Sequence, residues 1–169
     1  IETEKRATSG DLICLIDLDD FKTVNDAFGY RTGDRALHVI GSRLMTRFSD
    51  CIVAKASGSA FLLHADAHHS ARGLCDEILS SISERVQIDF KQINLTASIG
   101  VSFVNGESID HVINDAEIAL FTAKSNRKNT FAITDQATQN ERKRAMQLTR
   151  DLYDAELDRD FFVLFQPQV

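Results

Sequence analysis

Carboxylates cluster where a predicted strand ends, which is an arrangement that a divalent-metal site can use. The apolar run Leu12–Ile16 is followed directly by Asp17-Leu18-Asp19-Asp20. Hard cations such as Mg²⁺ bind through oxygen ligands, of which carboxylates are the main protein source. Further along, "VAKASGSAFLLHAD" (53–66) is typical of two short strands joined by a turn without charge. If the strand end and this turn belong to one metal site, the strand end offers carboxylates, whereas the turn offers Ser59 and Ala60, which carry no acid.

The segment "HADAHH" (64–69) also holds side chains of metal-ligand type, namely His64, Asp66, His68 and His69. It lies at a predicted strand–helix junction, and nothing in the sequence sets the relative positions of these groups. A short polar side chain is favoured near a helix start, where it accepts hydrogen bonds from free backbone N–H groups. We interpret the segment as a solvated cap with Asp66 near the helix start, and a metal site is the alternative.

Hydrophobic periodicity predicts the elements that must position these groups. The continuous apolar run at 12–16 predicts a strand buried on both faces. Apolar residues at helical spacing predict a short helix that Gly29 ends, a second helix with Asp34 as its N-cap, and two later helices over 71–82 and 109–123. Alternation from Ile93 to Phe103 predicts one half-buried strand. A hairpin over 52–63 and a last strand over 131–133 complete the set.

This order of elements predicts an α+β fold with a central mixed, largely antiparallel sheet flanked by helices. We expect this domain to occupy residues 1–134. Residues 135–157 are highly charged with a thin apolar stripe, which predicts a connecting helix that lies on a neighbour. The apolar run at 161–165 predicts that residues 158–169 hold the first strand of a truncated second domain. We therefore expect the chain to be a piece of a longer protein.

Charge and composition exclude several classes of function. The net charge is −6 at pH 7, whereas nucleic-acid-binding domains usually carry a basic face, so we expect no nucleic-acid partner. No apolar run is long enough to span a bilayer, so we expect no membrane contact from this chain. Cys14 and Cys75 lie in apolar patterns, which favours small core thiols in a reducing cytoplasm. A membrane anchor elsewhere in a longer protein is left open.

The stretch "LIDLDDFKTVNDAFGYRTGD" (15–34) resembles the GGDEF family, the diguanylate cyclases. Members usually show D-x-D-x-F-K-x-x-N-D followed by G-H-x-x-G-D, and here only Tyr30 departs, in place of the histidine. Ser98-Ile99-Gly100-Val101 and "AEIALFTAKSNRKN" (116–129) resemble two later motifs, the second with substitutions at Glu117, Phe121, Arg127 and Lys128. The likeness covers about residues 10–134, and it implies the palm-like fold of nucleotide cyclases.

The resemblance implies a reaction in which the 3′-hydroxyl of one GTP attacks the α-phosphate of another, each nucleotide being held by one protomer of a dimer. In the family, the first acid of D-x-D and the acids of the G-G-D/E-E-F turn hold the metals. Asp17 is present here as a residual, weak metal ligand, but the turn reads Ser57-Gly58-Ser59-Ala60-Phe61. A hydroxyl and a methyl group cannot replace anionic ligands of Mg²⁺. We therefore expect cyclase activity to be lost, with no catalytic residue at Ser59 or Ala60.

The resemblance also implies a nucleotide pocket. Asn25 and Asp34 match family positions that read the guanine edge, and Lys22, Lys124 and Lys128 match positions near phosphates. The alternative is that Asn25 and Asp34 are ordinary helix-end residues and that the two later lysines are a solvated last turn, which the helix dipole favours.

Two further motifs bear on partners and regulation. The family's inhibitory product site, R-x-x-D, is expected to be lost, because Arg47-Phe48-Ser49-Asp50 lies one residue too early and Phe48 and Cys51 occupy the matching positions. The tail "LYDAELDRDFFVLFQPQV" (152–169) resembles the opening of an EAL domain, a cyclic-di-GMP phosphodiesterase fold, with Gln166-Pro167 after its first strand.

These residues leave alternative functions open. In the first, the domain is a catalytically inactive regulatory module that binds GTP, with Mg²⁺ as its counterion, and biases a downstream EAL domain through the 135–157 helix. In the second, it is a nucleotide-free dimerisation or docking module whose surviving motif residues maintain the fold. An active diguanylate cyclase is the third interpretation.

Overall fold

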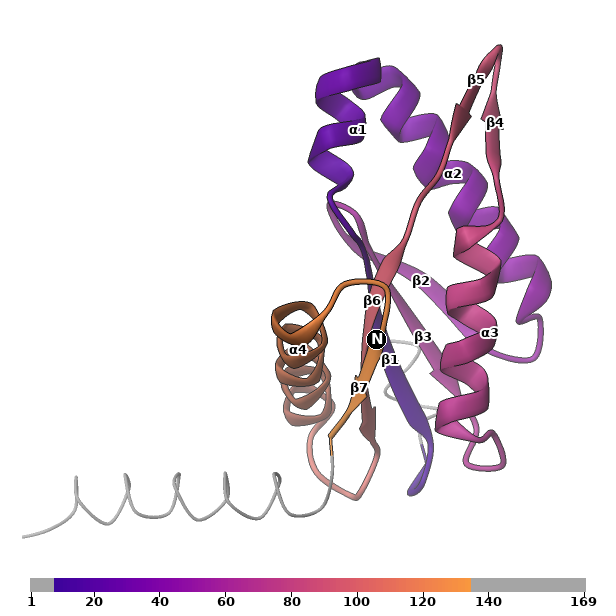
Figure 1. Ribbon diagram of the computed structural model, residues 1–169. Coiled ribbons are helices and arrows are strands. Elements are labelled where there is room, and N and C mark those ends of the chain that lie inside the picture. Colours follow the sequence, from indigo (N-terminus) through magenta and orange to yellow (C-terminus); the bar gives the residue numbers. More distant parts are fainter. Residues whose placement is uncertain (1–7, 135–169) are drawn as a thin grey trace, which may run out of the picture. The chain divides into compact units, whose positions relative to one another are not determined.

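A computed structural model describes residues 8–134, in which a five-stranded sheet lies between two layers of helices (Figure 1). The strand order is β2-β3-β1-β6-β7, and every neighbouring pair is antiparallel except the parallel pair β6–β7. The predicted α+β class, with a central and largely antiparallel sheet, is confirmed. In chain order the elements are β1 (Leu12–Leu18), α1 (Phe21–Phe28), α2 (Tyr30–Arg47), β2 (Ile52–Ser57), β3 (Ala60–Ala65), α3 (Ala71–Ser83), β4 (Val86–Ile88), β5 (Lys91–Ile93), β6 (Ala97–Phe103), α4 (Ile109–Asn126) and β7 (Phe131–Ile133).

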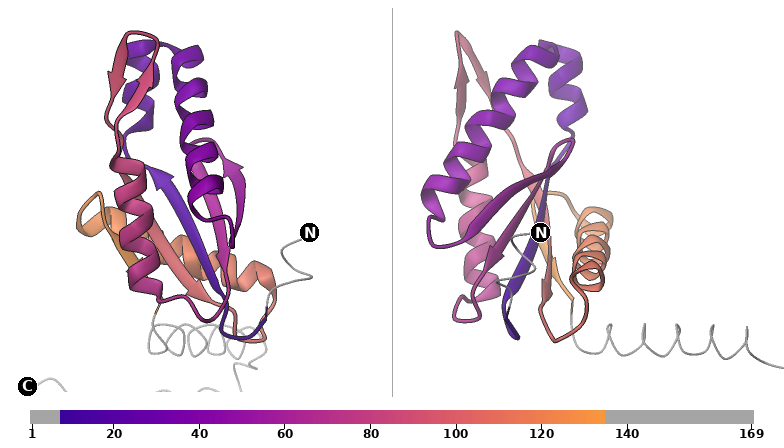
Figure 2. Two further views of the ribbon diagram at one scale, coloured as in Figure 1. Left: turned by 90° about the vertical axis from the view of Figure 1, so that its right-hand side faces the viewer. Right: turned by 180° about the vertical axis from the view of Figure 1, so that it is seen from behind.

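Helices cover both faces of the sheet, which explains why its central strands are buried. α2 and α3 lie over one face and α4 lies over the other (Figure 2). In the larger core cluster, Ile16 of β1 packs with Ile40 of α2 and Ile78 of α3. In the smaller cluster, Ile13 of β1 packs with Val112 of α4. Because successive strand residues point to opposite faces, the apolar run of β1 contributes to both clusters, as its composition predicts.

The single half-buried strand predicted from Ile93 to Phe103 is wrong in two respects. The chain forms two separate strands there, and the first, β5, pairs with β4 in a hairpin that the sequence did not predict. The second, β6, is buried on both faces as far as Ser102, because α4 covers the face that alternation assigned to solvent. Small residues occupy that face, and Ser102 Oγ donates to the carbonyl oxygen of Val112 at 2.7 Å.

The second helix begins at Tyr30, ahead of the predicted N-cap Asp34. Gly29 ends α1 as predicted, and its φ of +84° turns the chain directly into α2. Asp34 is therefore an exposed residue inside α2 rather than a capping residue. The turn at Gly29 places α1 against α2, so residues of both helices can line one cavity.

Parts of the sequence prediction concern residues that the structure does not describe. The chain divides into two units, residues 1–134 and 135–169. The predicted connecting helix (135–157) and the predicted strand of a second domain (158–169) lie outside the described residues. Within residues 8–134, no helix is both long enough and apolar enough to cross a membrane.

A buried carboxylate holds the start of β1. Asp11 is 2 % exposed and accepts hydrogen bonds from the backbone N–H and the hydroxyl of Thr8, from the N–H of Ala67, and from His64 Nε2 at 2.9 Å. Burial alone would raise the pKa of Asp11, but the hydrogen bonds from Thr8 and His64 outweigh burial and hold it below its ordinary value of 3.8. The ionised carboxylate therefore stabilises the folded state.

We expect the Asp11→Asn substitution to lower the free energy of unfolding at neutral pH by about 2 kcal/mol, because an amide nitrogen would face a hydrogen-bond donor. A depressed folded pKa contributes stability above the unfolded pKa and loses it as the pH falls through the folded pKa. The difference between wild type and variant should therefore shrink below about pH 4. Urea unfolding between neutral and acidic pH measures it, and a difference that is constant with pH would contradict the prediction.

Candidate functional site

The carboxyl end of β1, the two helices that follow it, the β2–β3 turn and the end of α4 surround a solvent-open cavity of about 490 Å³. Seven polar side chains that line it come from these separate elements: Asp17, Asp20, Lys22, Asn25, Asp34, Ser59 and Lys124. Five of these, all except Asp20 and Ser59, are residues that the sequence assigned to nucleotide or metal binding. Ser59 occupies a position of a family acid, and Asp20 directly precedes α1.

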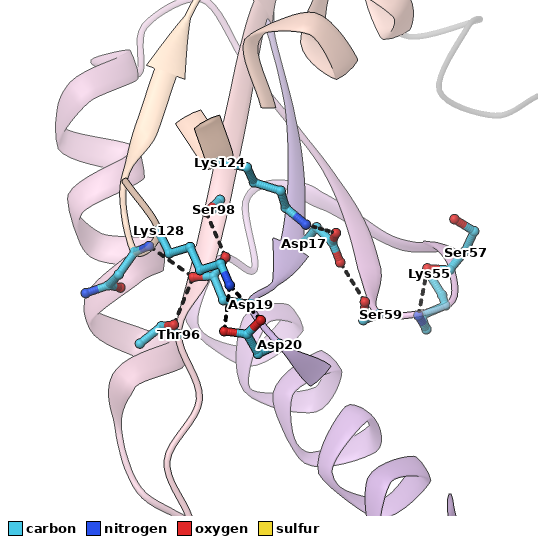
Figure 3. A network of polar contacts seen from close by, with 11 residues as sticks. Asp17, Asp19, Asp20, Lys55, Ser57, Ser59, Thr96, Ser98, Lys124 and Lys128 are labelled. Carbon is cyan, nitrogen blue, oxygen red and sulfur yellow. Dashed lines mark hydrogen bonds and ion pairs between the residues drawn. The ribbon is translucent and has the colours of Figure 1, made fainter. Parts of the chain in front are cut away.

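Sheet register places Asp17 opposite the β2–β3 turn. Asp17 pairs with Ala60 in the antiparallel ladder between β1 and β3, so the turn residue before Ala60 faces the Asp17 carboxylate. Ser59 Oγ donates to Asp17 Oδ1 at 2.6 Å (Figure 3). The hydroxyl that replaces a family acid is therefore a hydrogen-bond donor to the remaining acid, whereas a second carboxylate there would repel it.

The other oxygen of Asp17 is bound by a lysine. Lys124 reaches from the last turn of α4, and its Nζ donates to Asp17 Oδ2 (Figure 3). The side chains of Asp17 and Lys124 are 22 % and 36 % exposed, so the pair is partly shielded from solvent. Both oxygens of Asp17 are thus engaged by protein donors, and an ammonium group balances its charge.

Asp19, the second acid of the motif, has a structural role that the sequence analysis did not assign. It is 7 % exposed, and its oxygens accept from Thr96 Oγ1 and Ser98 Oγ at 2.8 Å each and from the backbone N–H of Asn129 at 3.0 Å. These bonds join the end of β1 to the start of β6 and to the segment after α4. Because its acceptor capacity is used inside the protein, Asp19 positions the elements around the cavity rather than a ligand.

Lys128, unlike Lys124, does not line the cavity. Its Nζ donates to both oxygens of Asp20, at 2.6 and 2.7 Å, on the exposed surface beside α1. The hydrogen bond to Asp20 raises the pKa of Lys128 above its ordinary value. The predicted set of nucleotide-binding residues is thus divided, with Lys128 held at the rim and the other four in the cavity.

Asn25 and Asp34 lie on the same cavity because α1 packs on α2. A Cβ atom on Gly33 would overlap the side-chain oxygen of Asn25, so a larger residue at this crossing would displace the Asn25 amide from its present position. Gly33 thus lets the Asn25 amide lie next to the turn of α2 that carries Asp34.

The β2–β3 turn is stabilised by Lys55, a residue that the sequence analysis did not assign to the site. Lys55 Nζ donates to the carbonyl oxygen of Ser57 at 3.4 Å (Figure 3). It also donates to the carbonyl oxygens of Gly58 and, at 3.2 Å, of Ala60, and it lies 4.8 Å from the centroid of the Phe61 ring. An isolated lysine before a serine-rich turn gives no signal in a single sequence. Its contacts tie the turn to β2 and limit how far Ser59 can move from Asp17.

The residues present do not fit a Mg²⁺ site. The cation needs charged oxygen ligands in near-octahedral geometry. At the turn, Asp17 is the anionic group, it is already paired with Lys124, and Ser59 and Ala60 contribute no charge. Among residues 8–134, Asp17 belongs to no group of three or more His, Cys, Asp or Glu side chains close enough to share an ion.

Arg47 and Asp50, which carry the displaced product-site pattern, take different partners. Arg47 Nη1 forms an ion pair with Glu84 Oε1 at 2.5 Å, and Asp50 Oδ2 lies 3.2 Å from His69 Nε2. Phe48, at one of the matching positions, is 3 % exposed and belongs to the core. We retain the prediction that the family's product site is lost, and these contacts support it.

The interpretation of residues 64–69 as a solvated cap is wrong for His64, which is 4 % exposed and bonded to Asp11. The cap of α3 is Ser70, whose Oγ accepts from the N–H of Gly73 at 3.4 Å, rather than Asp66. Asp66 instead accepts the N–H of His69 through its carbonyl oxygen at 3.1 Å, which forms a tight turn. The register of β3 turns His64 inward, and this register depends on pairing with β1 that the local sequence does not reveal.

Several known proteins are similar to this chain in sequence or in fold. The chain is 29% identical over 163 residues to the bifunctional diguanylate cyclase/cyclic di-GMP phosphodiesterase MucR of Pseudomonas aeruginosa, covering 93% of this chain and 24% of MucR. It is 27% identical over 160 residues to the cyclic di-GMP phosphodiesterase NbdA of the same organism, covering 92% and 20%. The chain thus spans about a quarter or less of the length of these relatives.

A solved structure and a family model agree with these relatives. An EAL/GGDEF domain protein from M. capsulatus superposes with a TM-score of 0.71 at 25% identity, covering 77% of this chain and 88% of that one. The sequence model described as "Diguanylate cyclase, GGDEF domain" matches residues 2–130, which is most of the chain. With its sheet order, its D-x-D strand end and its turn in place, the chain belongs to the GGDEF domain family.

Proposed function

We propose that this GGDEF domain is a regulatory module of a cyclic-di-GMP signalling protein, that it does not synthesise cyclic di-GMP, and that it retains a pocket for GTP. The observation that carries the proposal is the state of Asp17. Its two oxygens are bound by Ser59 and Lys124, and the turn acids that would join it in holding metals are absent. Phosphoryl transfer depends on cations that neutralise charge at the phosphates, and this arrangement lacks ligands for them.

The pocket for the base is better preserved than the metal site. Asn25 and Asp34 lie on one cavity of about 490 Å³ with Lys22 at its lining. A carboxylate accepts hydrogen bonds from the N–H groups of a guanine edge, and an amide can both donate and accept. The exposed carboxylate of Asp34, within α2, leaves it free to face a bound base. These features support GTP binding without chemistry.

The expected partner of this domain is an EAL phosphodiesterase in the same longer chain. The tail at 152–169 resembles the start of an EAL domain, and the relative NbdA is a cyclic di-GMP phosphodiesterase. A ligand of the GGDEF domain can change phosphodiesterase activity only if it favours one of two arrangements of the domains. We therefore propose that GTP changes the rate at which the full-length protein hydrolyses cyclic di-GMP.

The test is calorimetric titration of GTP into the purified chain. We expect saturable binding at micromolar GTP. Asp34→Ala should weaken it by at least about 10-fold, because a hydrogen bond to a charged group contributes about 1.5–3 kcal/mol. Asp76→Ala, which removes an exposed acid from α3 far from the cavity lining, is the matched control and should bind like wild type. Binding that Asp34→Ala leaves unchanged would place the nucleotide elsewhere.

A specific observation favours the second candidate, a nucleotide-free dimerisation or docking module. Both lysines that match phosphate-contacting positions late in the chain are paired with aspartates, Lys124 with Asp17 and Lys128 with Asp20. Phosphates would have to compete with these carboxylates. Absence of heat at millimolar GTP would favour this candidate, and sedimentation of the chain would then show whether it forms a homodimer.

A further inference from the structure

A second cluster of ligand-type side chains lies at the opposite end of the β2–β3 hairpin from the Ser59 turn. Ile52 pairs with His64 in the antiparallel ladder, so the residues before β2 and after β3 emerge side by side. The turn from Asp66 to His69 then folds the His69 ring back onto this end. Because β2 is six residues long, at about 3.3 Å per residue the cluster is separated from the turn by about 20 Å.

Three groups meet there within ligand distance of one another. Cys51 Sγ lies 4.0 Å from His69 Nε2 and 3.8 Å from Asp50 Oδ1, and His69 Nε2 lies 3.2 Å from Asp50 Oδ2. Zinc bonds of about 2.3 Å to sulfur and about 2.0 Å to nitrogen or oxygen, at tetrahedral angles, separate the ligand atoms by about 3.3–3.6 Å. The two short contacts of Asp50 use different oxygens; with one ligand atom from each residue, the three atoms lie within 4.8 Å of one another. Rotation of the exposed Asp50 side chain is therefore needed to reach the separations of a zinc site.

We propose that Asp50, Cys51 and His69 form a Zn²⁺ site, with water in the fourth position. A thiolate, an imidazole and a carboxylate are a donor set that suits zinc and not the hard cations Mg²⁺ or Ca²⁺. The His69 and Asp50 side chains are 22 % and 63 % exposed, so an ion can enter and keep a water ligand. On binding, the Cys51 thiol loses its proton to solvent and becomes a thiolate ligand.

The charge around the cluster favours a cation. The carboxylates of Asp50 and Asp66 both act on Cys51, and the negative potential that they create attracts a divalent ion. His68 stacks on His69 with ring centroids 4.7 Å apart, which limits rotation of the ligand ring. The other two cysteines of the sequence, Cys14 and Cys75, are buried.

The site would join two segments, namely the loop between α2 and β2, which carries Asp50 and Cys51, and the turn before α3, which carries His69. Ligand binding to the folded state alone stabilises that state. We therefore expect Zn²⁺ to raise the melting temperature of the chain and to leave its affinity for GTP unchanged, since the GTP cavity lies at the other end of the hairpin.

The experiment uses the reduced, metal-free 169-residue chain and Co²⁺ as a spectroscopic probe for the zinc site. We expect a thiolate-to-cobalt charge-transfer band that saturates at one equivalent and that Zn²⁺ removes by displacement. Cys51→Ser should abolish the band. His69→Gln should lower Zn²⁺ affinity, measured by chelator competition, by at least about 100-fold, since even loss of an outer-shell partner costs 10–100-fold.

The matched control is His111→Gln, which removes an exposed histidine from α4 and should change neither the band nor the affinity. Circular dichroism of each metal-free variant establishes that it is folded, and His69→Gln replaces Cys51→Ser as the deciding variant if the latter is not. Absence of the band at saturating Co²⁺ would overturn the proposal. So would a band or a Zn²⁺ affinity that His69→Gln leaves at the wild-type value.

Discussion

The wild-type chain, supplied with GTP and Mg²⁺, is expected to form cyclic di-GMP at least about 10⁴-fold more slowly than a GGDEF domain that carries both turn acids, since losing members of a catalytic unit has effects of this size. The reason is that Asp17 is paired with Lys124 and hydrogen-bonded to Ser59 in place of a metal. Chromatography of the nucleotide products measures the rate. Magnesium-dependent product formation that Asp17→Ala abolishes would contradict this prediction.

A variant in which the two turn acids are restored tests whether their absence is the reason that the turn does not bind Mg²⁺. In Ser59→Asp/Ala60→Glu, the new carboxylate at position 59 would lie against Asp17, which Ser59 Oγ now approaches to 2.6 Å. Like charges at this distance repel, so the variant should melt at a lower temperature than wild type without Mg²⁺ and should regain stability with it. Ser59→Asn/Ala60→Gln is the matched neutral control and should show no such dependence on Mg²⁺.

The Gly100→Ala substitution is expected to lower the free energy of unfolding by at least about 3 kcal/mol, the upper end of the usual cost of overpacking. A Cβ atom on Gly100 would overlap the carbonyl oxygen of Ala116 and the backbone nitrogen of Leu120, both in α4. Backbone atoms cannot move aside as a flexible side chain can, so the helix would have to leave the sheet. Chemical denaturation of the purified variant measures the loss.

A second glycine provides the matched control for this prediction. Gly73 lies inside α3, where a Cβ atom would meet only Ser70 at ordinary contact distances of 3.6 Å and more. Gly73→Ala should therefore stabilise the chain by about 0.5–1 kcal/mol through its helix propensity. Equal effects of the two substitutions would show that the tight packing of α4 on β6 does not limit stability.

Strong local patterns predicted most elements of the fold correctly. The apolar run of β1, the helical spacing of α3 and α4 and the turn at Gly29 each identify an element within its own sequence window. The predictions that failed concern segments whose structure depends on contacts with distant parts of the chain. Residues 93–103 alternate like a half-buried strand, but the packing of α4 buries the second face of β6, and pairing with β4 separates β5.

The candidate site shows the same division. The family motif identified Asp17, Asn25 and Asp34, and the absence of acids at Ser59 and Ala60 is visible in the sequence alone. The hydrogen-bond and ion-pair partners of these residues are not visible in the sequence. Lys124 meets Asp17 across 107 positions of the chain, and no local pattern predicts that contact.

By itself, therefore, the sequence determined the class of fold, the GGDEF resemblance and the loss of charge at the turn, because these depend on residue types and short spacings. Only the tertiary structure decided which donors neutralise Asp17, that Asp19 and His64 are internal, and that Cys51 and His69 meet. These facts depend on strand register and helix docking. Both are set by the burial of apolar surface over the whole domain, which no single window of the sequence contains.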